Sequence, residues 1–222
     1  TLETAEEITA LGTDVANLNA AALASLTSEQ VAALTTDQIA ALGSEDVAAL
    51  ASTALQGLTS AQVAALTTAA FGALGTDDLG ALTSEAVAGI TAAQVATLET
   101  PEEVTALGTD IANLGSAAMG ALTSVQVEAL TSEQVAALGS EDLAAMSSSA
   151  FTGLSTADLG TLTSAAVQGI TGEQGLRLAK LDMHQITLIR TQKICRTAGI
   201  IRMMKCIMLG IGVYIAMHSM IP

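Results

Sequence analysis

An eight-residue unit repeats from the start of the chain to about residue 174, and this period limits the possible folds more than any other feature. It is clearest at residues 27–50, which read TSEQVAAL, TTDQIAAL and GSEDVAAL. A chain of near-identical units buries the apolar face of each unit against its neighbours, which predicts a solenoid. The eighth position carries a large apolar anchor: Leu18, Leu26, Leu34, Leu42, Leu50, Leu58, Leu66, Leu74, Leu82, Ile90, Leu98, Leu107, Leu114, Leu122, Leu130, Leu138, Met146, Leu154, Leu162 and Ile170.

Four octads make a larger, 32-residue unit. Every fourth octad begins with glycine, and an aspartate follows each of these glycines closely. The glycines are Gly12, Gly43, Gly75, Gly108 and Gly139, and the aspartates are Asp14, Asp46, Asp78, Asp110 and Asp142. The positions of successive glycines differ by 31, 32, 33 and 31, so the length of the larger unit varies by at most one residue from 32.

The octads are gained and lost as whole units. Residues 2–18 return as residues 98–114, and in both copies a nine-residue octad precedes a seven-residue one, so the phase is recovered. Residues 154–170 copy residues 74–90 at an offset of 80 instead of 96, so two whole octads are missing. This pattern indicates that the octad is the physical unit of the fold.

Each octad is expected to form one helix of about six residues. Position two is Ser or Thr in most octads, and these residues are preferred N-caps. Pro101 directly follows Thr100, and proline is favoured at the first helical position, which supports position two as the cap. Position one would then separate the helices, with glycine suited to a left-handed turn. On this basis Ser44 is a predicted N-cap.

Glutamine recurs at position four. We expect these side chains on the surface at the helix start, so that Gln62→Ala costs almost nothing. The alternative is a hydrogen-bonded ladder along one edge of the stack. The residues are Gln30, Gln38, Gln62, Gln94 and Gln134.

The period separates the possible folds. In one continuous helix, eight residues turn by about 800°, so an apolar stripe would drift by about 80° per repeat. A β-solenoid would need alternating apolar residues, whereas here the apolar spacing is five and then three. We therefore predict an all-α solenoid of very short helices, with one helix per octad and four octads per 32-residue unit. The alternative is a β-solenoid. Leu58 and Leu138 should be buried between successive helices.

Charge is distributed very unevenly along the chain. Residues 1–171 contain no Lys or Arg and all but two of the acidic residues, and every basic residue lies at or after Arg177. Such a surface repels phosphate, so we expect no nucleic-acid binding by the repeats. Adjacent acids recur as Glu45/Asp46, Asp77/Asp78 and Glu141/Asp142. Calcium needs six to eight oxygens converging on one point, so we expect these acids to be solvated residues of a first helical turn.

The repeats lack the residues that catalysis usually requires. They contain no Cys, His, Lys or Arg, and therefore no nucleophile–base pair. Cys195, Cys206, His184 and His218 lie beyond the repeats at no spacing typical of a zinc site. We predict that the protein is not an enzyme and has no catalytic, cofactor-binding or metal-binding residue and no cofactor.

The composition divides the chain into two parts, a repeat solenoid at residues 1–174 and a basic, apolar C-terminal tail at residues 175–222. Residues 206–222 are uncharged, close to the shortest length for a membrane span. Three interpretations of the tail stay open: a cap on the last repeat, a membrane-seeking helix, or a non-native extension. The chain begins inside a repeat, so we expect it to be a fragment of a larger protein.

Residues 26–34, 34–42 and 58–66, each an octad with the anchor that precedes it, read LTSEQVAAL, LTTDQIAAL and LTSAQVAAL and share the pattern LTxxQ(V/I)xxL. They resemble repeat tracts of very large bacterial exported proteins of the adhesin-like, haemagglutinin-like or RTX-like kind. The resemblance covers residues 1–174 and implies a spacer, stalk or adhesive segment, outside the cell or at its surface, with a protein or cell-surface partner. The alternative is a solenoid scaffold that binds a peptide or protein. A third idea, ice or mineral binding by ranked Thr and Ser, conflicts with their capping role.

Overall fold

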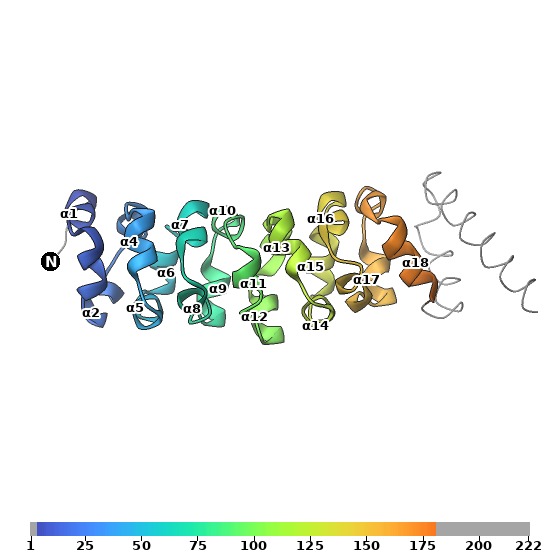
Figure 1. Cartoon of the computed structure of the whole chain (residues 1–222), viewed down its shortest axis with the longest axis horizontal. Helices are drawn as coiled ribbons and strands as arrows, with labels where there is room; N and C mark the ends of the chain where they lie inside the picture. Colours follow the sequence, from blue (N-terminus) through green and yellow to red (C-terminus); the bar gives the residue numbers. More distant parts are fainter. Residues whose placement is uncertain (1–3, 181–222) are drawn as a thin grey trace, which may run out of the picture.

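The computed structural model describes residues 4–180 as one straight stack of short helices (Figure 1). No strand occurs among these residues, and each octad contributes one helix. The predicted all-α solenoid is therefore confirmed and the β-solenoid is excluded. Most of the predicted tail, residues 181–222, lies outside the described residues, so its three interpretations stay predictions.

The helices follow the octads closely along the chain. In the first half they are α1 (Ala5–Ala10), η1 (Gly12–Asn17), α2 (Ala20–Ala24), α3 (Ser28–Ala32), α4 (Thr36–Ala41), α5 (Ser44–Ala49), α6 (Ser52–Leu55), α7 (Ser60–Ala65), α8 (Thr68–Phe71), α9 (Thr76–Ala81) and α10 (Ser84–Val87). In the second half they are α11 (Ala92–Val95), α12 (Pro101–Ala106), η2 (Gly108–Asn113), α13 (Ser116–Ala121), α14 (Ser124–Glu128), α15 (Ser132–Ala137), α16 (Ser140–Ala145), η3 (Ala150–Gly153), α17 (Thr156–Thr161), η4 (Ala166–Gly169) and α18 (Gly172–Lys180). Elements named η are 3-10 helices.

The N-cap of a typical helix is position one of its octad, so the prediction of position two was wrong. In α7 the hydroxyl of Thr59 accepts a hydrogen bond from the backbone N–H of Gln62, and Ser60 is the first helical residue. Each Thr-Ser pair offers two neighbouring cap candidates. The glutamine three residues after the threonine completes a reciprocal capping box only with position one, and this decides between them.

Thr100 is a true N-cap, as predicted, with Pro101 at the first helical position. The nine-residue octad carries its extra residue before Thr100, so Thr100 takes the place that position one has elsewhere. Ser44 is the first residue of α5 and not its cap. Its hydroxyl instead donates to the carbonyl oxygen of Ala69 in α8, at 3.0 Å.

The predicted left-handed turn at position-one glycines is confirmed at Gly12 and Gly108 and is wrong at Gly43, Gly75 and Gly139. Gly43, Gly75 and Gly139 have φ values of −82°, −76° and −91°, which are ordinary extended backbone. A left-handed φ of +55° occurs only at Gly12 and Gly108 among the described residues. At these two glycines the nine-residue octad runs directly into a 3-10 helix formed by the seven-residue octad. The positive φ thus belongs to the phase correction and not to the regular repeat.

Helices three octads apart pack on each other in successive turns. For example, α4 packs on α7, and α7 packs on α10. Hydrogen bonds from glutamine side chains reach one octad further, as from Gln62 to Val31. One turn of the solenoid therefore contains between three and four octads, and the 32-residue sequence unit is longer than one turn.

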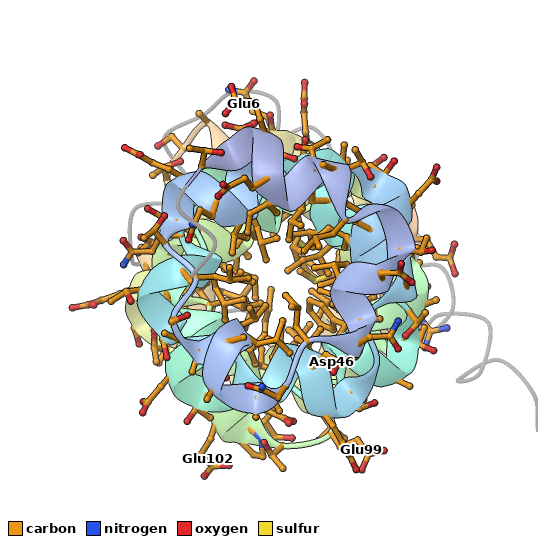
Figure 2. The ribbon with its side chains drawn as sticks, turned by 90° about the vertical axis from the view of Figure 1, so that its left-hand side faces the viewer. Glu6, Asp46, Glu99 and Glu102 are labelled. Carbon is orange, nitrogen blue, oxygen red and sulfur yellow. The ribbon has the colours of Figure 1, made fainter. Side chains whose placement is uncertain are left out.

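The core runs through the centre of the stack and is made by positions five and eight of the octads. Figure 2, which looks along the stack, shows carbon side chains pointing inward and carboxylates pointing outward. Leu58 and Leu138 are 3% and 2% exposed, so their predicted burial is confirmed. Phe71 and Phe151, the aromatic residues of the repeats, are also fully buried. Because every turn contributes the same set of side chains, the core is uniform and continuous.

Glycine at position seven permits a close approach between turns. A Cβ atom on Gly57, Gly89, Gly153 or Gly169 would overlap the backbone carbonyl of Ser28, Ser60, Ser124 or Ser140, respectively. Each pair lies three octads apart. Backbone cannot move aside as the end of a flexible side chain can, so these turns depend on the missing side chain.

We expect Gly89→Ser to destabilise the fold by roughly 1–3 kcal/mol or more, because the added side chain must push two turns apart. The matched control is Gly43→Ser, where the nearest atom to a new Cβ is Asp46 Oδ2 at 3.5 Å. Gly43 is an N-cap in extended backbone, and serine is favoured there, so the control should be neutral or stabilising. Equal urea midpoints for the two variants would contradict the close approach.

Candidate functional site

The side chain of Gln62 joins two turns of the solenoid. Its Oε1 accepts from the backbone N–H of Thr59 at 2.8 Å, which completes the cap of its own helix, α7. Its Nε2 donates to the carbonyl oxygens of Val31 at 2.9 Å and Leu34 at 2.7 Å, at the end of α3. One amide therefore satisfies orphan groups at the start of one helix and the end of another, four octads earlier.

The same bridge recurs along the stack. Gln94 reaches Val63 and Leu66, Gln126 reaches Val95 and Leu98, and Gln174 reaches Leu143 and Met146, with Nε2–O distances between 2.7 and 2.9 Å. Gln38 reaches Ile8 and Gly12, and Gln134 reaches Val104 and Gly108, at 2.9–3.1 Å. We call these six residues, Gln38, Gln62, Gln94, Gln126, Gln134 and Gln174, the bridging glutamines.

The prediction that these glutamines lie on the surface was wrong. Gln38, Gln94 and Gln134 are 1% exposed, and Gln62 is 3% exposed. Gln30 is also buried, and it forms the capping box with Thr27. In the described residues the bridging glutamines bond to carbonyls at helix ends of an earlier turn, and not to one another as a ladder along one edge would require. Gln126 and Gln174 were not singled out from the sequence, although both stand at position four.

Aspartate replaces the glutamine in most octads that begin with glycine. The carboxylates of Asp46, Asp78 and Asp142 accept from the backbone N–H of Gly43, Gly75 and Gly139 at 2.8, 3.2 and 2.7 Å. Aspartate has no N–H to donate to a carbonyl of the previous turn. These residues therefore cap their own helices without binding those carbonyls, although the Asp78 carboxylate also accepts from the Ser52 hydroxyl three octads earlier.

The acid pairs do not converge on a common point. The first acid of each pair, Glu45, Asp77 or Glu141, is exposed, and the second is half-buried at the helix cap. Within residues 4–180, no group of three or more side chains is arranged to hold a metal ion. The expectation of solvated first-turn residues thus describes only the first acid of each pair.

Asp142 is the acid most affected by its surroundings. Burial raises the pKa of its carboxyl, the bond from the Gly139 N–H opposes this rise, and the charge of Glu141 adds to it. The main cause of the raised pKa of Asp142 is thus its partial loss of contact with water, which disfavours the charged form.

Serine hydroxyls at position two make further contacts between turns. Ser52 donates to Asp78 Oδ1 at 2.7 Å and Ser84 donates to Asp110 Oδ1 at 2.8 Å, each three octads later. The hydroxyls of the repeat are thus used in caps and in contacts between turns.

Acidic side chains point outward from the stack. In Figure 2, Glu6, Glu99 and Glu102 point outward at different places around the circumference. No Lys or Arg precedes Arg177, so these charges have no basic side chains among them in the repeats. In the described residues, no helix is both long and apolar enough to cross a membrane.

A model of the ALTTAQ repeat matches the chain five times in succession, at residues 8–44, 39–76, 71–109, 104–140 and 135–171. The chain belongs to the ALTTAQ repeat family. The start positions of successive ALTTAQ matches differ by 31, 32, 33 and 31, as the positions of the glycines that open every fourth octad do. One family repeat is therefore four octads. Neither the search of curated proteins nor that of solved structures gave a match.

We expect Gln62→Ala to cost roughly 1–3 kcal/mol, because it removes the partners of the Thr59 N–H and of two buried carbonyls. Gln62→Glu should cost at least as much, since a carboxylate oxygen would face those carbonyls in place of the N–H donor. Gln56→Ala, at an exposed position in the next octad back, is the control and should be neutral. Equal thermal stability of the Gln62 and Gln56 variants would show that the bridge has no energetic role.

Proposed function

We propose that this ALTTAQ repeat tract is a non-enzymatic spacer, stalk or adhesive segment of a large bacterial surface or secreted protein. The observation that carries the proposal is the uninterrupted stack, in which each turn repeats the core and most turns carry a buried glutamine bridge. In such a stack the length follows the number of octads. A spacer needs this property, and a catalytic domain does not.

The surface supports the same proposal. Acidic side chains face outward around the circumference, and like charge keeps neighbouring copies apart and in solution. The repeats hold no cysteine, so their stability is independent of the redox state of the compartment. Both properties suit a segment held outside the cell.

The alternative is a scaffold that binds a peptide or protein, and one observation favours it. Residues 47–76 contain no charged residue, so nearly a whole turn is free of the acids found elsewhere. Thr67, Thr68 and Ala69 are exposed there. A neutral band on an acidic rod is a surface that a partner could approach without meeting negative charge.

Deleting residues 59–90 tests whether length follows the octads. After this deletion Gln94 stands at the former place of Gln62, four octads earlier, and can bridge to Val31 and Leu34. We expect a folded, monomeric and proportionally shorter rod by small-angle X-ray scattering. Deleting only residues 63–66 shifts the phase and should disrupt the stack locally. Equal damage from the two deletions would contradict the octad as the unit of length.

The proposed location at the cell surface is tested on intact bacteria that produce the protein. Proteinase K added outside the cells should remove the repeats while a cytosolic marker survives. Trypsin is unsuitable as a probe because no Lys or Arg precedes Arg177. Repeats that resist proteinase K until the cells are lysed would contradict the surface location, and the deletion experiment is independent of this result.

A further inference from the structure

Hydrogen bonds between turns cross the octad boundaries of the stack, with one exception among residues 4–180. The bridges of Gln38, Gln62, Gln94, Gln126 and Gln134 together cross every octad boundary from Leu11/Gly12 to Leu130/Thr131. The bridge of Gln174 to Leu143 crosses the later ones, from Met146/Ser147 to Ile170/Thr171.

The exception is the boundary between Leu138 and Gly139. Gln134 reaches back from α15 to Val104, and Gln174 reaches back only as far as Leu143 in α16. The hydrogen bonds of the serine hydroxyls do not cross this boundary either. Ser84 donates to Asp110 before it, and Ser148 donates to Glu173 after it. In the described part of the chain, no hydrogen bond joins a residue up to 138 to a residue from 139 on.

The missing octads explain this seam. Residues 154–170 copy residues 74–90 at an offset of 80, two octads short of the 96-residue period. In the first copy Gln62 lies four octads after the octad of Val31 and Leu34 and bridges to it. In the second copy the octad at that place contains Asp158. Asp158 is separated in sequence from Val127 and Leu130 by the same distances that separate Gln62 from its acceptors, Val31 and Leu34.

Asp158 cannot make the bridge. Its carboxylate accepts from the backbone N–H of Ser155 at 3.0 Å and from the Ser155 hydroxyl at 2.6 Å, which caps its own helix. It has no N–H to donate to the previous turn. The register is nevertheless intact, because α17 packs on α15 as α7 packs on α4.

Packing alone holds the two sides of the seam together. Helix α14 packs on η3, α13 packs on α16, and Gly153 comes into close backbone approach with Ser124. Apolar packing has no direction, whereas the bridges fix one turn over another. The seam therefore has a core like any other boundary but lacks the hydrogen bonds between turns.

We propose that residues 139–180 are a separately opening unit, and that the Leu138–Gly139 seam is the point at which the solenoid opens before the rest of the stack. Solenoids unfold by local interfaces, so removing the bonds of one interface creates a unit with its own opening equilibrium. Heating, denaturant or tension along the stack then separates this C-terminal unit first. The proposal is independent of the stalk function.

Asp158→Gln supplies the missing bridge and is the decisive variant. The introduced glutamine would stand in the same relation to Val127 and Leu130 that Gln62 has to its own acceptors, and its Oε1 can still accept from Ser155. Asp158→Asn removes the same charge and keeps the cap, but is too short to bridge. Asp46→Gln adds a glutamine to α5, where the boundaries are already crossed by the bridges of Gln38 and Gln62.

The measurement is native-state hydrogen exchange of the full chain, followed by mass spectrometry at increasing denaturant. Residues 139–180 should exchange together and earlier than residues 59–138. Asp158→Gln should slow their exchange by roughly tenfold, the effect of one net hydrogen bond. Asp158→Asn and Asp46→Gln should leave the difference between the two regions in place.

Two results would overturn the proposal. One is a gradient of exchange rates that falls smoothly inward from residue 180, which indicates simple fraying of the end without a seam. The other is an Asp158→Gln variant whose residues 139–180 exchange no more slowly than those of Asp158→Asn.

Discussion

The solenoid depends on a side-chain amide that serves two helices at once. A helix of four to six residues leaves almost all of its backbone groups without partners inside the helix. Such a helix is also far below the length that is stable alone in water. The bridging glutamines supply partners for these groups and also join the short helices to one another. Oε1 caps the start of one helix, and Nε2 donates to the carbonyls at the end of a helix in the previous turn. Burial of this amide is tolerated because its donors and acceptor are paired.

The other features of the repeat fit around this bridge. Alanine at position four, as at Ala54 and Ala86, is buried where no glutamine stands, and glycine at position seven of the same octads lets the turns come closer. Aspartate takes the place of glutamine mostly where position one is glycine, and there it caps its helix without binding a carbonyl of the previous turn. Glutamine, aspartate and alanine octads thus differ in how they join the turns while sharing one core. Whole octads can be lost, but the loss of a glutamine octad removes a bridge, as at Leu138–Gly139.

Local pattern was sufficient to predict one helix per octad and the buried anchors, because the apolar spacing and the capping residues are properties of neighbouring residues. It was insufficient to place the caps, since Thr59 and Ser60 are both good candidates and only the reciprocal bond with Gln62 chooses between them. The surface assignment of Gln62 failed for a different reason. Its partners Val31 and Leu34 lie almost four octads away along the chain, and that separation follows from the pitch of the solenoid. The same holds for Gly89, whose need for close approach to Ser60 exists only between turns.

The most direct test of the account observes the bridging amides themselves. Side-chain amide protons of glutamine normally exchange with solvent quickly, so we would record the 15N-resolved side-chain NH2 signals of assigned glutamines after transfer to D2O. The account predicts that the Nε2 signals of Gln62, Gln94 and Gln126, whose amides are buried and donate to two carbonyls, persist well after that of the exposed Gln56 has vanished. Simultaneous loss of all four signals would show that the bridges do not hold the turns together.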